Sequence, residues 1–277
     1  MKKKLFLLLW GVFALIGLCF VVYPTIADYI NETHNKGVIS GYNQNTQTLS
    51  DDEIETQKSK AKRFNELLAQ GVFDTETENE EYKTLMESYY DILDFDGIIC
   101  TVEIPQINVN LPVYHGYENN NEVLKKGCVH LLNTSLPIGG ESTHSAISAH
   151  SGYPSQKFFD DLEDLVIGDT FTVNVLNEKL EYKVCDINIV EPDDSELLEI
   201  VDGKDYVTLV TCYPFSVNTH RLLVRGERVQ ETETPTINTS TIDEAHTDEQ
   251  SFNYIFIALA VFIIAVVMLV IIRIRRT

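Results

Sequence analysis

The chain has 277 residues and a formal net charge of −21, from 21 Lys and Arg against 42 Asp and Glu. Six of the bases lie at the two ends, so residues 24–251 carry a net −27. This acidic middle excludes nucleic-acid wrapping, because phosphate binding needs clustered lysine and arginine. A hydrophobic content of 44% is typical of a folded protein, and the length suggests one or two domains.

Two uncharged runs of 19 residues, Leu5–Tyr23 and Tyr254–Ile272, lie near the ends of the sequence. About 20 apolar residues cross a bilayer as a helix, so residues 1–23 and 252–277 are each predicted to be a membrane anchor. Lysines precede the first run and arginines follow the second. The positive-inside rule therefore predicts a two-pass protein of the cell membrane, with both termini in the cytoplasm and residues 24–251 outside.

The first run has an alternative interpretation as a signal peptide that is cleaved after Ala27. The apolar part of a signal peptide is usually about 7–15 residues long, and this run is longer. The length therefore favours an uncleaved anchor.

Residues 24–96 are predicted to form a stalk followed by helices. The stretch 28–50 is polar with little apolar periodicity, which is typical of a stalk. Ser50 and Glu53 fit a capping box that opens a helix ending near Gly71. A second amphipathic helix is predicted over 77–93, where four apolar side chains recur at helical spacing: Tyr82, Leu85, Tyr89 and Leu93.

Residues 97–229 are rich in short segments with the alternating pattern of β-strands. The expected strands are 98–104, 109–114, 145–149, 169–176, 179–191, 206–212 and 221–229. Asn177-Glu178 is the expected hairpin connection, and one helical insert is expected near 156–165. Seven or eight short strands in about 130 residues predict a mainly β fold, a closed or nearly closed β-barrel. The Thr- and acid-rich residues 230–251 are predicted to link this barrel to the second anchor.

The sequence contains five cysteines, one of which differs from the others in its setting. Cys100, Cys128 and Cys185 lie in or beside apolar strand-like runs and are expected to be buried; a disulfide among these three stays open in an exported protein. Cys212 ends an expected strand and is followed by Tyr-Pro, which places its thiol at the rim of the sheet. The spacing of cysteine and histidine is not that of a zinc site.

His150 ends another expected strand, and Arg221, beside His220, opens the last one. A barrel can bring His150, Cys212 and Arg221 together at one rim. Such a trio suits acyl transfer: a thiolate attacks, a nearby imidazolium lowers the thiol pKa and later donates a proton, and a guanidinium stabilises the oxyanion. The sequence has no G-x-S-x-G, H-E-x-x-H or phosphate-binding glycine loop to support a rival hydrolase chemistry.

The string Thr208-Leu-Val-Thr-Cys212 resembles the TLxTC signature of sortases, the membrane-anchored cysteine transpeptidases of Gram-positive bacteria. Other strings resemble the class C, pilin-polymerising branch: Ile104-Pro-Gln-Ile, Leu111-Pro-Val-Tyr-His-Gly, Asn133-Thr-Ser-Leu-Pro-Ile-Gly-Gly, Val190-Glu-Pro-Asp-Asp and Thr219-His-Arg-Leu-Leu-Val-Arg-Gly-Glu. The resemblance covers roughly 90–229 together with the two-anchor layout. It implies a sortase-like closed β-barrel of seven to eight strands with N-terminal helices, flanked by two transmembrane helices.

The resemblance also implies roles for individual residues. Cys212 would be the nucleophile on the Thr–Gly bond of an LPXTG-like sorting signal, His150 the general acid/base and Arg221 the transition-state stabiliser. A lysine amine of a pilin would resolve the thioacyl enzyme, and this chemistry needs no metal or organic cofactor. Thr208 and Thr211 would help to form the substrate-binding site, and His220 would have a positional role there.

Three features depart from the class C pattern. No proline occurs between Pro24 and Pro105, so the Asp-Pro-aromatic lid motif is absent, and whether another segment such as 72–80 covers the site stays open. Ser151 follows His150 where the family often has arginine, and the approach to His130 reads Gly-Cys-Val-His. These two differences bear on substrate choice.

Two other functions compete with pilin polymerisation. The first is a sortase that anchors surface proteins to peptidoglycan cross-bridges. The second is a non-catalytic surface protein that is anchored at both ends and binds partners through its barrel. The second is disfavoured because residues suited to all three catalytic roles are present.

Overall fold

The structure is a computed structural model that describes residues 2–70, 86–116, 120–154 and 156–229. Residues 26–230 form one compact unit, and the chain before Ile26 belongs to another. The expected linker 230–251 and the expected second anchor 252–277 lie outside the described residues.

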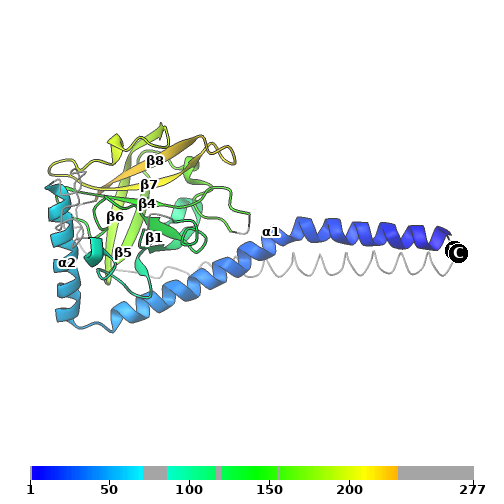
Figure 1. The fold of residues 1–277 in the computed structure, drawn as a ribbon, viewed down its shortest axis with the longest axis horizontal. Coiled ribbons are helices and arrows are strands. Elements are labelled where there is room, and N and C mark those ends of the chain that lie inside the picture. Colours follow the sequence, from blue (N-terminus) through cyan, green and yellow to red (C-terminus); the bar gives the residue numbers. More distant parts are fainter. Residues whose placement is uncertain (1, 71–85, 117–119, 155, 230–277) are drawn as a thin grey trace, which may run out of the picture. The chain divides into compact units, whose positions relative to one another are not determined.

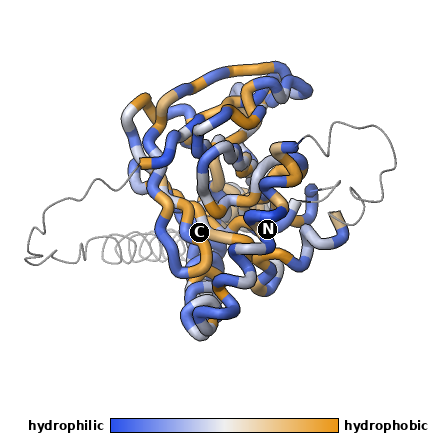
Figure 2. The backbone as a smooth tube through the Cα atoms, turned by 90° about the vertical axis from the view of Figure 1, so that its left-hand side faces the viewer, coloured by the Kyte–Doolittle hydropathy of each residue, from blue (hydrophilic) through white to orange (hydrophobic). Residues whose placement is uncertain are grey.

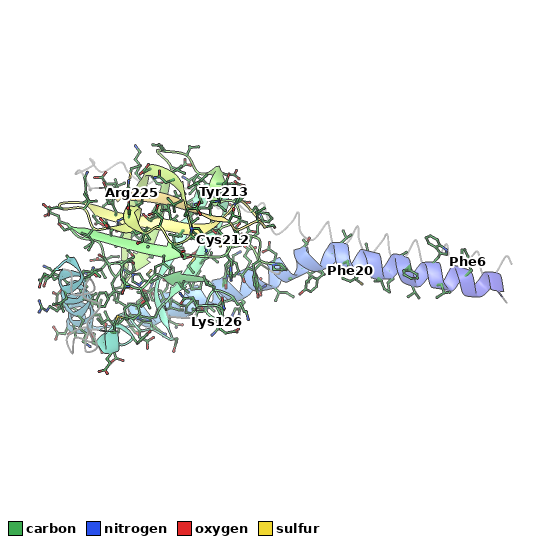
Figure 3. All side chains as sticks on the ribbon, turned by 45° about the horizontal axis from the view of Figure 1, so that its top comes forward. Phe6, Phe20, Lys126, Cys212, Tyr213 and Arg225 are labelled. Atoms are coloured by element: carbon green, nitrogen blue, oxygen red, sulfur yellow. The ribbon has the colours of Figure 1, made fainter. Side chains whose placement is uncertain are left out.

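The first element is a single long helix, α1 (Lys2–Gln47). In its N-terminal half, large apolar side chains are more than 60% exposed, among them Phe6, Trp10, Phe13 and Phe20. Phe6 and Phe20 project from the helix in Figure 3. The helix is long and apolar enough to cross a membrane, and its most apolar window is 0% buried in the protein. A signal sequence passes the same test of length and composition, so both interpretations of this run stay open.

Most of the stretch 28–50, predicted as a stalk with little apolar periodicity, is helical, because α1 continues to Gln47. Its buried side chains recur every three or four residues: Asn35, Ile39, Tyr42 and Thr46. The Tyr42 hydroxyl donates to the Ile99 carbonyl (3.0 Å) and accepts the Leu176 N–H (3.3 Å). The buried face mixes polar and apolar residues, which explains why a search for apolar periodicity did not reveal the helix.

Helix α2 (Asp51–Ala69) begins with the predicted capping box. The Glu53 N–H donates to the Ser50 hydroxyl (3.3 Å), and the Ser50 N–H donates to the Glu53 carboxylate (2.9 Å). These hydrogen bonds lower the pKa of Glu53. The helix lies alongside the barrel in Figure 1 and buries Phe64 against it.

The second predicted helix falls partly on 77–85, which lie outside the described residues. Its described part is helical only over 86–89, and the chain then turns through Leu93, whose φ is +58°. The Tyr89 side chain is fully buried, and its hydroxyl lies 2.9 Å from Nδ1 of His130.

The predicted barrel is confirmed, with eight strands. These are β1 (Ile98–Ile104), β2 (Val109–Tyr114), β3 (Cys128–His130), β4 (Thr143–Ser148), β5 (Thr170–Val175), β6 (Glu178–Val190), β7 (Asp205–Tyr213) and β8 (His220–Arg228). They close in the order β1-β2-β3-β4-β7-β8-β6-β5 (Figure 1). Only β3 has no counterpart among the expected strands, because three residues are too few to show an alternating pattern.

Two connections differ from the expectation. The β5–β6 hairpin turns at Leu176 and Asn177, both with positive φ, one position earlier than predicted. The helical insert expected over 156–165 is only a short 3-10 turn, η2 (Leu162–Asp164). The N–H groups of Phe158 and Phe159 are bonded to the Asp160 carboxylate and the His150 carbonyl, so they are not available to a helix.

Strands β4, β7 and β8 present two different faces. Side chains on the inner face, such as Leu209 and Val224, join the main core. Ala146, Val210 and Leu223 form a separate apolar cluster on the other side, which we call the outer face. Figure 2 shows hydrophobic and hydrophilic residues interleaved along the barrel, as this alternation requires.

Candidate active site

Cys212 and Arg221 are paired across two neighbouring strands. Cys212 lies near the end of β7, and the antiparallel register sets it directly opposite Arg221 at the start of β8. Directly opposed residues of an antiparallel pair point to the same face. Cys212 is two positions beyond Val210, so both side chains belong to the outer face. The thiol is half-buried (Figure 3).

His150 reaches the same place from β4, which runs parallel to β7 with Ser148 beside Val210. Two hydrogen bonds continue this register: the Ala149 N–H donates to the Val210 carbonyl (3.1 Å), and the Thr211 hydroxyl donates to the Ala149 carbonyl (2.9 Å). Two residues beyond Ser148, the register sets His150 next to Cys212. The structure therefore brings the three predicted catalytic residues to one end of the outer face.

The His150 imidazole packs against two aromatic rings, which also contact each other. The Tyr153 ring stacks on it with centroids 5.3 Å apart and planes within 9°, and the Phe158 ring lies 6.2 Å away. Burial lowers the pKa of His150, and the nearby Asp160 carboxylate opposes this shift. Burial thus favours the neutral imidazole, and the Asp160 carboxylate favours the protonated one.

The Arg221 guanidinium is held by the turn between β7 and β8. Its Nη1 donates to the carbonyls of His220 (3.0 Å) and Asn218 (3.5 Å). A guanidinium carries five N–H donors, so others can meet an oxygen of a substrate.

The two motif threonines are buried on opposite faces of β7, Thr208 on the face of Val210 and Cys212 and Thr211 on the other. Thr208 is 1% exposed and Thr211 is 3% exposed. Both hydroxyls have hydrogen-bond partners inside the protein, and the substrate-binding role of the two threonines stays a prediction. Thr211 fixes the residue that precedes His150, as described above.

Thr208 belongs to a second buried contact, with His144. The Thr208 hydroxyl lies 2.7 Å from His144 Nε2, and His144 Nδ1 lies 2.8 Å from the Glu199 carbonyl. A carbonyl only accepts, so Nδ1 carries the proton and Nε2 accepts from Thr208. The motif threonine thereby ties β7, through His144, to the segment that carries Glu199.

His220 is not brought together with the trio. It pairs with Tyr213 across β7 and β8, one position from the Cys212–Arg221 pair, and therefore faces the other way. Its Nδ1 lies 2.9 Å from the Thr219 hydroxyl, and its Nε2 lies 3.5 Å from the Glu191 carboxylate. These contacts are consistent with a positional role.

A groove of about 810 Å³ runs over the outer face and reaches Arg221. Ser148, Val210 and Leu223 form its floor, and the walls are 131–134 on one side and 192–195 with 198–200 on the other. Leu68 and Ala69 of α2 also line it. Of the three candidate catalytic residues, Arg221 lines this groove, so an extended peptide lying in it would reach the Arg221 side chain.

The structure also shows the environment of the cysteines other than Cys212. All five are free, so the disulfide that the sequence left open does not form here. Cys100 and Cys128 are buried as predicted, and burial raises the pKa of both thiols. Cys185 is exposed, against the prediction, because its position on β6 points away from the core.

The sequence analysis did not identify Tyr153, Asp160, His144 or the groove walls as parts of the site. Tyr153 and Asp160 follow His150 closely in the sequence. An aromatic and an acidic residue near a candidate catalytic histidine could have indicated that they belong to its surroundings. Nothing in the sequence pairs His144 with Thr208, which is 64 positions away.

The chain is similar over its barrel to known proteins. A family model described as the sortase domain matches residues 102–229. The solved structure of sortase C1 of GBS Pilus Island 1 is 34% identical, covers 75% of this chain and 97% of its own, and superposes with a TM-score of 0.64. The chain belongs to the sortase family.

Other sortases support this assignment. Sortase C of Clostridium perfringens, solved with the C-terminal cell wall sorting motif, is 40% identical, covers 70% of this chain and 98% of its own, and has a TM-score of 0.60. Sortase C1 of Streptococcus agalactiae is 41% identical, with coverage of 70% and 98% and a TM-score of 0.62. Among curated relatives, sortase D of Bacillus subtilis (strain 168) is 28% identical over 131 residues, which are 46% of this chain and 62% of that protein. Sortase A of Bacillus anthracis is 28% identical over 137 residues, 50% of this chain and 62% of that protein.

Proposed function

We propose that this sortase is a cysteine transpeptidase that cleaves an LPXTG-like sorting signal and joins it to a lysine amine of a pilin. The observation that carries the proposal is the convergence of Cys212, His150 and Arg221 at one end of the outer face, where Arg221 also lines the groove. Each comes from a different strand end, and the register of β4, β7 and β8 brings them to one face.

The first half-reaction forms a thioester. The Cys212 thiolate attacks the threonine carbonyl of the sorting signal, and the resulting oxyanion is stabilised by the Arg221 guanidinium. The protonated His150 donates its proton to the departing glycine amine as the Thr–Gly bond breaks. The threonine is left on the Cys212 sulfur as a thioester.

The second half-reaction transfers the threonine to an amine. The neutral His150 removes a proton from the acceptor amine as it attacks the thioester carbonyl, and Arg221 again stabilises the oxyanion. The Cys212 thiolate leaves, and an amide bond joins the two proteins. With a lysine as acceptor this is an isopeptide bond.

Several solved structures that resemble this chain are sortases C, one of them named for a pilus island. These similarities favour a pilin lysine as the acceptor. The alternative is the amine of a peptidoglycan cross-bridge, which would use the same half-reactions and anchor surface proteins to the wall. A barrel that only binds partners is disfavoured, because it would not require a thiol, an imidazole and a guanidinium at one end of the outer face.

We also propose that the protein is anchored in the cell membrane with its catalytic barrel outside and both termini in the cytoplasm. The exposed apolar side chains of α1 and the basic residues at both ends of the sequence support this topology. The second anchor rests on the sequence of 252–277 alone.

Incubation of the full chain in detergent with an LPXTG-type peptide and candidate pilins tests the function. Mass spectrometry should show a thioacyl adduct on Cys212, followed by a peptide–lysine isopeptide, and neither in Cys212→Ala. Transfer only to cross-bridge amines would support wall anchoring. A wild-type chain that forms no adduct with any sorting peptide would overturn the enzyme assignment.

A further inference from the structure

The carboxylate of Asp160 closes the turn that follows His150. One oxygen accepts the Gly152 N–H (3.1 Å) and the other accepts the Phe158 N–H (2.9 Å). The Phe159 N–H donates to the carbonyl of His150 itself (3.0 Å). The start and the end of the turn are thus bonded to each other and to His150.

The aromatic support of His150 depends on the same turn. Tyr153, which stacks on the imidazole, comes one residue after Gly152, and Phe158 contacts both rings. The Phe158 side chain is 1% exposed, so it anchors the turn to the core. A loss of the Asp160 bonds would release the rings that set the plane of the imidazole.

The turn also contacts the connection between β7 and β8. Gly152 has a φ of +76°, and a Cβ built on it would lie 3.4 Å from the Phe215 ring. Asp160, Thr211 and Phe215 line one small void, so Asp160 lies near the strand end that carries Cys212. Asp160 is therefore close to the elements that carry all three catalytic residues.

We propose that Asp160 is a positioning residue for His150: its carboxylate fixes the turn that holds the imidazole, and its negative charge favours the protonated imidazole. The part of the proposal that concerns catalysis rests on the proposed function, in which protonated His150 donates to the leaving amine. The part that concerns the position and charge of His150 stands on the geometry alone.

The charges around His150 come from several elements. Burial lowers the pKa of His150 and Asp160 raises it. Cys212 and Arg221 face it from β7 and β8. Glu163 borders the void beside Asp160, and Lys157 and Asp161 form an ion pair of 2.8 Å. Among these groups, Asp160 alone combines a charge that raises the His150 pKa with bonds to the turn.

The neighbouring Asp161 offers a matched control. It is also a carboxylate of this segment, but it pairs with the exposed Lys157 ammonium. Asp160→Asn keeps the size of the side chain and removes its charge and one acceptor. Asp161→Asn makes the same change one residue away.

The charge is tested on the full chain in detergent, in a Cys212→Ala background that removes the thiol titration. The Cε1–H signal of His150, assigned through His150→Gln, is followed against pH by NMR. We expect Asp160→Asn to lower the midpoint by roughly one pH unit, and Asp161→Asn to leave it unchanged. An unchanged midpoint in Asp160→Asn, or an equal shift in both variants, would overturn the proposal.

The catalytic consequence is tested with the Cys212 enzymes. The limb of the pH–kcat/KM profile that belongs to His150 should move to lower pH in Asp160→Asn, and Asp160→Glu, which keeps the charge, should return it toward the wild-type position. A lower rate with the limb unmoved would reduce Asp160 to a structural role. If Asp160→Asn does not fold, Asp160→Ser, which removes the charge and keeps a hydroxyl acceptor, takes its place in the titration, and an unchanged His150 midpoint in that variant counts against the proposal. Because the NMR titration needs no turnover, it remains decisive if the proposed function fails.

Discussion

The hydroxyl of Thr211 connects the sortase signature to the catalytic histidine, and Thr211→Val removes it with little change in shape. The side chain is 3% exposed and donates to the Ala149 carbonyl over 2.9 Å. Valine is β-branched like threonine, so the strand propensity of β7 is retained. The substitution therefore isolates the hydrogen bond.

The expected cost follows from the burial of the two partners. A buried carbonyl left without a donor costs about 1–3 kcal/mol, so the free energy of unfolding should fall by that amount. The same carbonyl belongs to the residue before His150. A displacement of the imidazole by about 1 Å lowers kcat/KM by roughly 100-fold, and we expect a loss of roughly 10- to 100-fold.

Denaturant unfolding and peptide transpeptidation measure the two effects in parallel. Thr211→Ser keeps the hydroxyl and should retain most of the activity. Wild-type kcat/KM in Thr211→Val would refute the link between this bond and the position of His150. An equal loss in the serine variant would show that the methyl group, not the hydroxyl, matters.

Three further predictions concern the oxyanion site, the helix contact and acid stability. Arg221→Lys should lower kcat of transpeptidation by roughly 100-fold with little change in KM, because a single ammonium cannot replace the planar fork of donors; wild-type kcat would exclude Arg221 from oxyanion stabilisation. Tyr42→Phe leaves the Ile99 carbonyl and the Leu176 N–H without a buried partner and should cost about 1–3 kcal/mol of unfolding free energy, whereas an unchanged denaturation midpoint would mean that α1 is not held by this hydroxyl. Burial lowers the pKa of His130 from 6.5 to about 4. Between these two pH values the unfolded chain therefore binds a proton at His130 and the folded chain does not. This contribution to stability is complete above pH 6.5 and is lost as the pH falls toward 4, by about 3 kcal/mol in all. His130→Gln should flatten that part of the stability–pH curve, and an identical slope in the variant would contradict the assignment.

Local patterns determined most of the secondary structure of the barrel. The alternation of apolar and polar residues located β1 and β2 at their observed bounds and five other strands within two residues, because each pattern lies within one segment. The capping box likewise located the start of α2, since Ser50 and Glu53 are three residues apart. The three candidate catalytic residues could also be named from the sequence, because each stands at the end of an expected strand.

The tertiary structure decided what depends on residues far apart in the chain. It showed that α1 continues to Gln47, because the helix is stabilised by contacts such as that of Tyr42 with Ile99, which hydropathy does not record. It showed that the Thr208 hydroxyl is a buried partner of His144. It also located the groove and set Asp160 behind His150. Strand register and loop packing are non-local, so the sequence alone could name the candidate catalytic residues, while only the fold shows which side chains surround them.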